Sequence, residues 1–128
     1  MAEAADVVRA AFHRANAGDP DGLAALCHEA VEFHDLPEIP GSGIYRGRDG
    51  IRDWLQTVRE ASDSLELQIR GLAERQDAVL VETGAEMTGR TSGARPAGFW
   101  TVWRVRDGLI SYHHGYSHRK EAVADFEG

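Results

Sequence analysis

The sequence predicts a single α+β domain in which helices come first and an antiparallel sheet follows. Apolar residues recur at helical spacing through most of the first 60 residues, and from Leu65 onward they alternate with polar residues as in strands. The dipeptide Asp107-Gly108 marks a tight β-hairpin, because a two-residue type I′ loop needs a positive φ at both positions. The length of 128 residues fits one domain that spans residues 1–128.

The first half of the chain contains three expected helices and one short strand. A first helix over residues 4–15 has one apolar face, and the pair Asp19-Pro20 supplies an N-cap and a first-turn proline for a second, short helix. Alternation over residues 31–36 indicates a strand that leads into a loop rich in proline and glycine. A third helix over residues 49–60 presents an apolar stripe, so each of these helices is expected to bury one face.

Four strands are expected after residue 65, with turns at Gln76-Asp77, near residues 91–93 and at Asp107-Gly108, and a short helix over residues 118–126 closes the chain. Regular pairing from a two-residue final turn fixes the register of the last hairpin, and directly opposed side chains share a face. The expected pairs on the apolar face are Trp103 with Tyr112, Thr101 with His114, and Phe99 with Tyr116. We expect this face to line the core.

Composition excludes several classes of function. The chain has 14 Lys and Arg against 21 Asp and Glu, a net charge of −7, which argues against binding to nucleic acid or to an anionic membrane. No apolar run approaches the roughly 20 residues needed to span a bilayer, so a cytoplasmic protein is expected. The single Cys27 forms no internal disulfide and builds no thiolate metal cage. A small neutral or cationic ligand is the better match to this charge.

Three segments together resemble a known family. They are FHDLPEIP at residues 33–40, YRGRDGI at residues 45–51, and VRDGLI at residues 105–110 with the strand that continues to Tyr116. In this order and spacing they resemble the SnoaL-like polyketide cyclase branch of the nuclear-transport-factor-2-like (NTF2-like) superfamily, which includes relatives of ketosteroid isomerase and limonene epoxide hydrolase. The resemblance extends over nearly the whole chain.

The resemblance implies a cone, in which a curved antiparallel sheet packs on the N-terminal helices and encloses an apolar pocket. Such domains commonly dimerise through the outer face of the sheet, so we expect a homodimer with Trp100 and Val102 in its interface. Members include cofactor-independent cyclases, isomerases, dehydratases and epoxide hydrolases, and also proteins that only bind ligands, so the fold does not determine the chemistry. We expect no cofactor.

Asp35 is the first candidate catalytic residue, because the resemblance places it where ketosteroid isomerases carry their general base. A carboxylate beside Phe33 and apolar pocket walls is suited to proton transfer. The alternative is that Asp35 caps the loop that follows the strand, which is a common role for Asp before irregular backbone.

Two histidines complete the expected catalytic set. His118 lies where related cyclases and epoxide hydrolases carry an acid, and an imidazole near its working pH also gives and takes a proton. The alternative for His118 is a solvent-exposed residue at the start of a helix. His114, opposite Thr101, is expected to polarise a substrate oxygen unless it is an ordinary core residue, whereas His34 and His113 are expected to face away from the pocket.

The remaining predicted site residues form the pocket wall. They are Phe33, Trp54, Thr83, Met87, Phe99, Thr101, Trp103, Tyr112 and Tyr116. Thr83 and Ala85 occupy the positions at which epoxide hydrolases carry a charged Arg and Asp, which argues against that mechanism. No metal site is expected, because the adjacent His113 and His114 face opposite ways on a strand.

These observations predict a cofactor-free acid/base enzyme that acts on a small, mostly apolar, oxygenated metabolite. Cyclisation, isomerisation, dehydration and hydration are all compatible with the expected groups. A binding module without catalysis is the first alternative. A dimerising scaffold whose cone is filled by side chains is the second.

Overall fold

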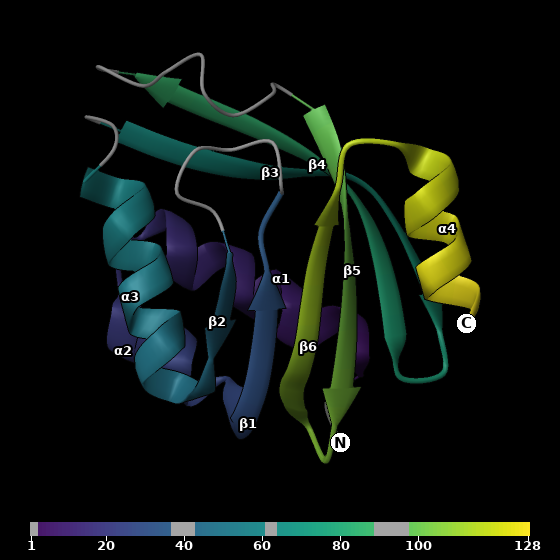
Figure 1. Ribbon diagram of the computed structural model, residues 1–128, viewed down its shortest axis with the longest axis horizontal. Coiled ribbons are helices and arrows are strands. Elements are labelled where there is room, and N and C mark those ends of the chain that lie inside the picture. The colour runs from purple at the N-terminus through teal and green to yellow at the C-terminus, as the bar shows by residue number, and fades with distance from the viewer. Residues whose placement is uncertain (1–2, 37–42, 61–63, 89–97) are drawn as a thin grey trace.

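A computed structural model describes residues 3–36, 43–60, 64–88 and 98–128 of the chain (Figure 1). Within these ranges the order of elements confirms the predicted α+β fold and adds a short strand before the third helix. The helices are α1 (Ala4–Asn16), α2 (Pro20–Ala25), α3 (Gly47–Glu60) and α4 (Arg119–Glu127). The strands are β1 (Cys27–His34), β2 (Ile44–Arg46), β3 (Ser64–Arg75), β4 (Ala78–Thr88), β5 (Gly98–Arg106) and β6 (Leu109–Tyr116). The turn expected near residues 91–93 lies outside the described residues.

The strands form one curved sheet in the order β2-β1-β6-β5-β4-β3 (Figure 1). All neighbouring pairs are antiparallel except β1 and β6, which run parallel, so the expectation of a wholly antiparallel sheet is wrong at this pair. Because parallel neighbours need a long crossover connection, β1 and β6 are separated in sequence by α3 and the β3–β5 meander. Helices α1, α2 and α3 supply side chains to the core on one face of the sheet, and α4 packs on the other face.

The predicted N-cap of α2 and the predicted apolar face of α3 are confirmed. Asp19 caps α2 by accepting a hydrogen bond from the backbone N–H of Gly22 at 2.9 Å, and Pro20 occupies the first turn. The apolar stripe of α3 is buried through Ile51, Trp54, Leu55 and Val58. None of the helices in the described ranges has the length and apolar character needed to span a membrane.

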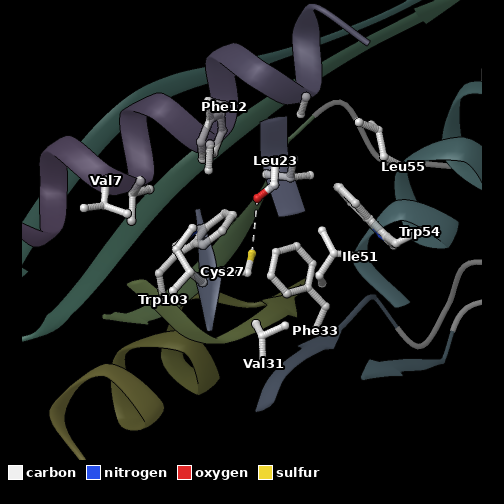
Figure 2. Close-up of a cluster of buried hydrophobic side chains, with 14 of the residues drawn as sticks. Val7, Phe12, Leu23, Cys27, Val31, Phe33, Ile51, Trp54, Leu55 and Trp103 are labelled. Carbon is white, nitrogen blue, oxygen red and sulfur yellow. Dashed lines mark hydrogen bonds between the residues drawn. The ribbon is translucent and has the colours of Figure 1, made fainter. Parts of the chain in front are cut away.

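The main core lies between these helices and the sheet, and its centre is aromatic (Figure 2). Phe33 on β1 is fully buried, and its ring centroid lies 5.4 Å from that of Trp54 on α3 and 5.6 Å from that of Trp103 on β5. Phe12 on α1 packs against Trp103 from the helix side, with the ring centroids 5.7 Å apart. Two helices and two strands of the sheet therefore meet at one aromatic cluster.

Cys27 lies at the start of β1. It is fully buried, and its Sγ–H donates to the carbonyl of Leu23 at 3.5 Å (Figure 2). Burial raises the pKa of the thiol to about 12, which outweighs the lowering effect of Arg48. Because the thiolate is the reactive form, this residue is an inert core side chain.

The last hairpin has the predicted turn but not the predicted register. Asp107 and Gly108 have φ angles of 54° and 78°, as a type I′ turn requires, and Val105 pairs with Ile110 as expected. A β-bulge then leaves Ser111 as an extra residue between that pair and the next one, Arg104 with Tyr112. A one-residue shift moves every following side chain to the opposite face of the sheet. Beyond the bulge the pairs are Trp103 with His113, Val102 with His114, Thr101 with Gly115, and Trp100 with Tyr116.

Candidate active site

A cavity lies between the helices and the concave face of the sheet. The cavity volume is about 30 Å³. This is the size that one or two water molecules require, so the cavity is narrow in this conformation. The lining residues are Ala11, Phe12, Ala15, Leu23, Phe33, Trp54, Val58, Leu67, Thr83, Phe99, Thr101, Trp103 and His113.

Six of the nine residues predicted for the pocket wall lie around this cavity, and their part in ligand binding stays a prediction. Phe33, Trp54, Thr83, Phe99, Thr101 and Trp103 all line the cavity, whereas Tyr112 and Tyr116 do not. The side chain of Met87 lies outside the described residues. Ala11, Phe12 and Ala15 of α1 and Leu23 of α2 also line the cavity, although the pocket wall predicted from the sequence included no residue of either helix.

His113 is the histidine that lies in the cavity, and the prediction that His114 would share the face of Thr101 is wrong. His113 is 5% exposed, and its ring centroid lies 4.5 Å from those of both Phe33 and Trp103. Phe33 is also its direct neighbour across the parallel β1–β6 pair, and the ring of Trp54 is 6.4 Å away. The lining residues carry no acidic or basic side chain other than this imidazole. His113 is therefore the imidazole of the cavity wall, a side chain type that can both accept and donate a proton.

Two threonines supply the other polar atoms of the cavity wall. The Oγ1 atoms of Thr83 on β4 and Thr101 on β5 are 3.1 Å apart, and the indole N–H of Trp103 donates to Thr101 Oγ1 at 2.8 Å. Both threonines are buried, with exposed fractions of 1% and 2%. The cavity thus has one apolar, helical side and a sheet side with hydroxyl groups and an imidazole.

Asp35 follows β1 and contacts the cavity wall through Trp54. The indole N–H of Trp54 donates to Asp35 Oδ2 at 3.1 Å, and the backbone N–H of Leu36 donates to Oδ1 at 2.8 Å. The carboxylate therefore caps the start of the loop and also contacts an aromatic residue of the cavity. Asp35 is half-buried and is not itself one of the lining residues.

His118 and His114 lie away from the cavity. His118 is exposed at the residue that precedes α4, where its side chain makes no capping hydrogen bond. His114 lies on the outer face, and its ring stacks on those of His34 and Tyr116 with centroid separations of 4.8 and 4.2 Å. Burial lowers the pKa of His114, and the neighbouring His34 lowers it further, although a hydrogen bond with the Gly115 carbonyl opposes the shift. The three residues predicted as catalytic are thus not brought together.

Tyr112 and Tyr116 hold α4 against the outer face instead of lining the pocket. Their hydroxyl groups donate to Asp125 Oδ2 at 2.7 and 2.8 Å, and Arg104 Nη2 donates to Oδ1 at 2.9 Å. Burial and the hydrogen bond with Asp125 raise the pKa of Tyr116 to about 12, so the phenol stays protonated as a donor. Although burial alone would raise the pKa of Asp125, these three hydrogen bonds lower it below its ordinary 3.8.

We expect Asp125→Asn to reduce the loss of stability in acid. The pKa of Asp125 is lower in the folded protein than in the unfolded chain. The contribution of the ionised carboxylate to folding stability is therefore complete above its ordinary pKa and disappears as pH falls through its pKa in the folded protein. Urea unfolding at neutral pH and near pH 3 measures the difference for each protein. The exposed Asp53 on α3 provides the control variant Asp53→Asn. Equal acid dependence in wild type and Asp125→Asn would contradict this account.

Val102, one of the two residues predicted for a homodimer interface, is covered within the chain. Val102 is fully buried with Leu80 and with Ala122 of α4, and Trp100 packs partly buried against the same cluster. The guanidinium of Arg119 lies 5.7 Å from the Trp100 ring centroid. Homodimer formation itself remains a prediction, and α4 would have to take part in any interface over this region.

No group of three or more His, Cys, Asp or Glu side chains in the described ranges has an arrangement that could hold a metal ion. The site is thus an apolar pocket on one face of a six-stranded sheet, with a buried imidazole and two buried hydroxyl groups in its wall and a carboxylate nearby.

Residues 8–113 match the model of the SnoaL-like domain family, and the chain belongs to this family. None of the curated proteins matches it in sequence. Among solved structures, TerC co-crystallised with polyporic acid is 22% identical, with a TM-score of 0.76 over 96% of each chain. Further solved structures of this fold are described as NTF2-like proteins.

Two other solved structures carry names that refer to ring formation. A putative polyketide cyclase from Sinorhizobium meliloti is 18% identical, with a TM-score of 0.70 over 86% of this chain and 93% of its own. The epoxide hydrolase/cyclase-like enzyme SalBIII, described with a role in pyran ring formation in the polyether salinomycin, is 20% identical, with a TM-score of 0.69 over 91% and 92%. At these identities the likeness establishes the fold, which hosts more than one chemistry.

Proposed function

We propose that the protein is a cofactor-free acid/base enzyme that moves a proton on a small, mostly apolar, oxygenated metabolite in the cavity. The observation that carries this proposal is His113, a buried imidazole in a wall otherwise made of apolar, aromatic and hydroxyl side chains. Enzymes place titratable groups in such apolar clefts to match their proton affinity to the reaction. His113 replaces His114 and His118 as the proposed proton carrier.

The proposed chemistry begins with proton abstraction next to a carbonyl group. A neutral imidazole has one acceptor nitrogen and one donor N–H, so His113 takes a proton from carbon at one and donates from the other. The C–H electron pair moves into the carbon–carbon bond and the carbonyl electrons move onto oxygen, where the Thr101 hydroxyl donates a hydrogen bond. Return of the proton to a different atom gives isomerisation. Attack of the enolate carbon on a second carbonyl gives cyclisation, and loss of a hydroxide leaving group gives dehydration.

Asp35 is the second group of the proposed site. Its carboxylate accepts the hydrogen bond of the Trp54 indole, and Trp54 is part of the cavity wall. A substrate that extends past Trp54 would bring its outer end to Asp35. The proteins with related folds that are named for cyclisation support a ring-forming reaction, since ring closure also needs a proton removed and returned within one pocket.

A binding module is the alternative function, because the same apolar cavity could hold a ligand without exchanging a proton with it. The cavity volume is only about 30 Å³, so a metabolite enters only if aromatic wall residues move apart. A protein that only stores or carries a ligand would need the same movement but no proton exchange. The test must therefore measure chemistry and not only binding.

The test is exchange of carbon-bound hydrogen with solvent. The protein is incubated in deuterium oxide with a panel of small aryl ketones, and deuterium beside the carbonyl is measured by mass spectrometry. Saturable exchange above the buffer rate supports the proposed function. Binding of the same ketones without exchange supports the binding module.

We expect Asp35→Asn to lower the exchange rate by about tenfold, which is less than the effect of removing a direct proton carrier. The amide oxygen still accepts from the indole of Trp54, but the charge is lost. The matched control is Asp19→Asn, another capping carboxylate, which lies at the start of α2. An exchange rate in Asp35→Asn equal to that of the control would remove Asp35 from the site and leave it as a loop cap.

A further inference from the structure

A chain of hydrogen bonds runs along the sheet side of the cavity. The indole N–H of Trp103 donates to Thr101 Oγ1 at 2.8 Å, the two threonine hydroxyl oxygens are 3.1 Å apart, and the Thr83 hydroxyl donates to the Val81 carbonyl at 3.3 Å. All three side chains line the cavity and are at most 5% exposed. Such buried polar groups need partners, so the direction of each bond matters.

Both ends of this chain have a fixed direction. An indole N–H only donates and a carbonyl oxygen only accepts, so Thr101 accepts from Trp103, and Thr83 donates whenever it bonds to Val81. The middle bond is different, because either threonine hydroxyl can be its donor. One hydrogen bond in the wall can therefore reverse.

The two directions present opposite chemistry to a ligand. When Thr101 donates to Thr83 and Thr83 donates to Val81, every proton is used and the Thr101 oxygen keeps one lone pair that accepts from a ligand. When Thr83 donates to Thr101, the Thr101 proton points to a ligand oxygen. The second arrangement gives up only the bond to Val81, which is the longest of the three at 3.3 Å.

We propose that this reversible chain lets Thr101 bind both tautomers of an enolisable ketone. A keto oxygen only accepts and takes the Thr101 proton, whereas an enol O–H donates to the Thr101 lone pair. This inference rests on the proposed function, since a proton moved between carbon and oxygen interconverts these two forms. It assigns the substrate to the class of uncharged, enolisable carbonyl compounds. It also makes Thr83 the residue that determines whether the site can bind ligands that donate a hydrogen bond as well as ligands that accept one.

Thr83→Val tests this role, because valine has the shape of threonine without the hydroxyl group. In this variant Thr101 loses its acceptor at position 83, so it donates only to a ligand. The probes are phenol, which brings an O–H donor, and cyclohexanone, which has the same number of carbon atoms and only an acceptor oxygen. Binding is followed by NMR titration of the Trp103 indole N–H resonance, with thermal unfolding to verify that each variant is folded.

The expected result is that wild type binds both probes with affinities within a few-fold of each other. Thr83→Val is expected to lower the affinity for phenol by about tenfold relative to the affinity for cyclohexanone, which is the effect of one unsatisfied hydrogen-bonding group. Thr83→Ser keeps the hydroxyl group and is expected to retain the wild-type ratio. Thr101→Val removes the hydroxyl group that contacts the ligand and is expected to lower the affinity for both probes to a similar extent.

Three results would overturn the proposal: an unchanged phenol-to-cyclohexanone ratio in Thr83→Val, an equal shift in Thr83→Ser, or no saturable binding of either probe to wild type. None of these measurements depends on turnover. A ratio that changes as expected in a protein without deuterium exchange would leave the binding chain in place and remove the catalytic proposal. Deuterium exchange that depends on His113, together with an unchanged phenol-to-cyclohexanone ratio in Thr83→Val, would support the catalytic proposal and remove the reversible chain.

Discussion

Replacing His113 with Gln is expected to lower the rate of deuterium exchange by about 10²–10⁴-fold, the usual contribution of a general acid/base group. The amide of Gln makes hydrogen bonds but does not titrate near neutral pH, so hydrogen bonding is kept while proton transfer is lost. His113 lies 4.5 Å from the rings of Phe33 and Trp103, so the change is made inside the cavity wall. Mass-spectrometric exchange rates at several pH values measure the effect.

The adjacent histidine provides a matched control for this experiment. His114 lies on the outer face against His34 and Tyr116, so His114→Gln is expected to change the exchange rate by less than about twofold. His113→Phe serves as a second variant, because it removes the imidazole without burying an amide. Equal rates for the variants at 113 and 114, both folded by thermal unfolding, would contradict the assignment of His113.

The helices and strands were predictable because their signals are local. The Asp19-Pro20 cap, the stripe of α3 and the Asp107-Gly108 turn each follow from a few neighbouring residues. The cavity wall was largely predictable for the same reason, since alternation along β4 and β5 assigns faces to Thr83, Thr101 and Trp103 without reference to other strands.

Which histidine lines the cavity was not predictable from local signals. It depends on the bulge at Ser111, whose hydroxyl donates to the Arg104 carbonyl at 3.3 Å, and Ser is a common strand residue with no bulge signature. The bulge turns His113 inward and His114 outward, so a register error of one residue exchanged the two. Gly115 was the available hint. It pairs with Thr101, and a Cβ there would lie 3.3 Å from the side chain of Leu36, so a larger residue on this inner face would require Leu36 to shift.

The same bulge explains why the second half of the predicted site was misplaced. Tyr112 and Tyr116 alternate with His113, so they moved to the outer face together with His114. On that face their hydroxyl groups donate to Asp125 on α4. Asp125 lies about ten residues away along the chain, and no sequence pattern identifies it as their partner. The side chains of a hairpin can therefore be assigned to a face of the sheet only when the positions of its bulges are known as well as its turn.

Phe33→Ala is expected to lower the free energy of unfolding by about 3–5 kcal/mol, the range for removing a fully buried phenylalanine. Phe33 has no exposed surface, and its ring contacts Trp54, Trp103 and His113, so deletion leaves a void where α3 meets the sheet (Figure 2). Urea unfolding measures the change, and Ile44→Ala on the edge strand, 47% exposed, is the control with an expected loss below about 1 kcal/mol. A loss in Phe33→Ala as small as in the control would mean that the aromatic cluster does not hold the helices on the sheet. Because His113 packs on the same ring, a destabilised cluster would also lose the fixed imidazole on which the proposed proton transfer depends.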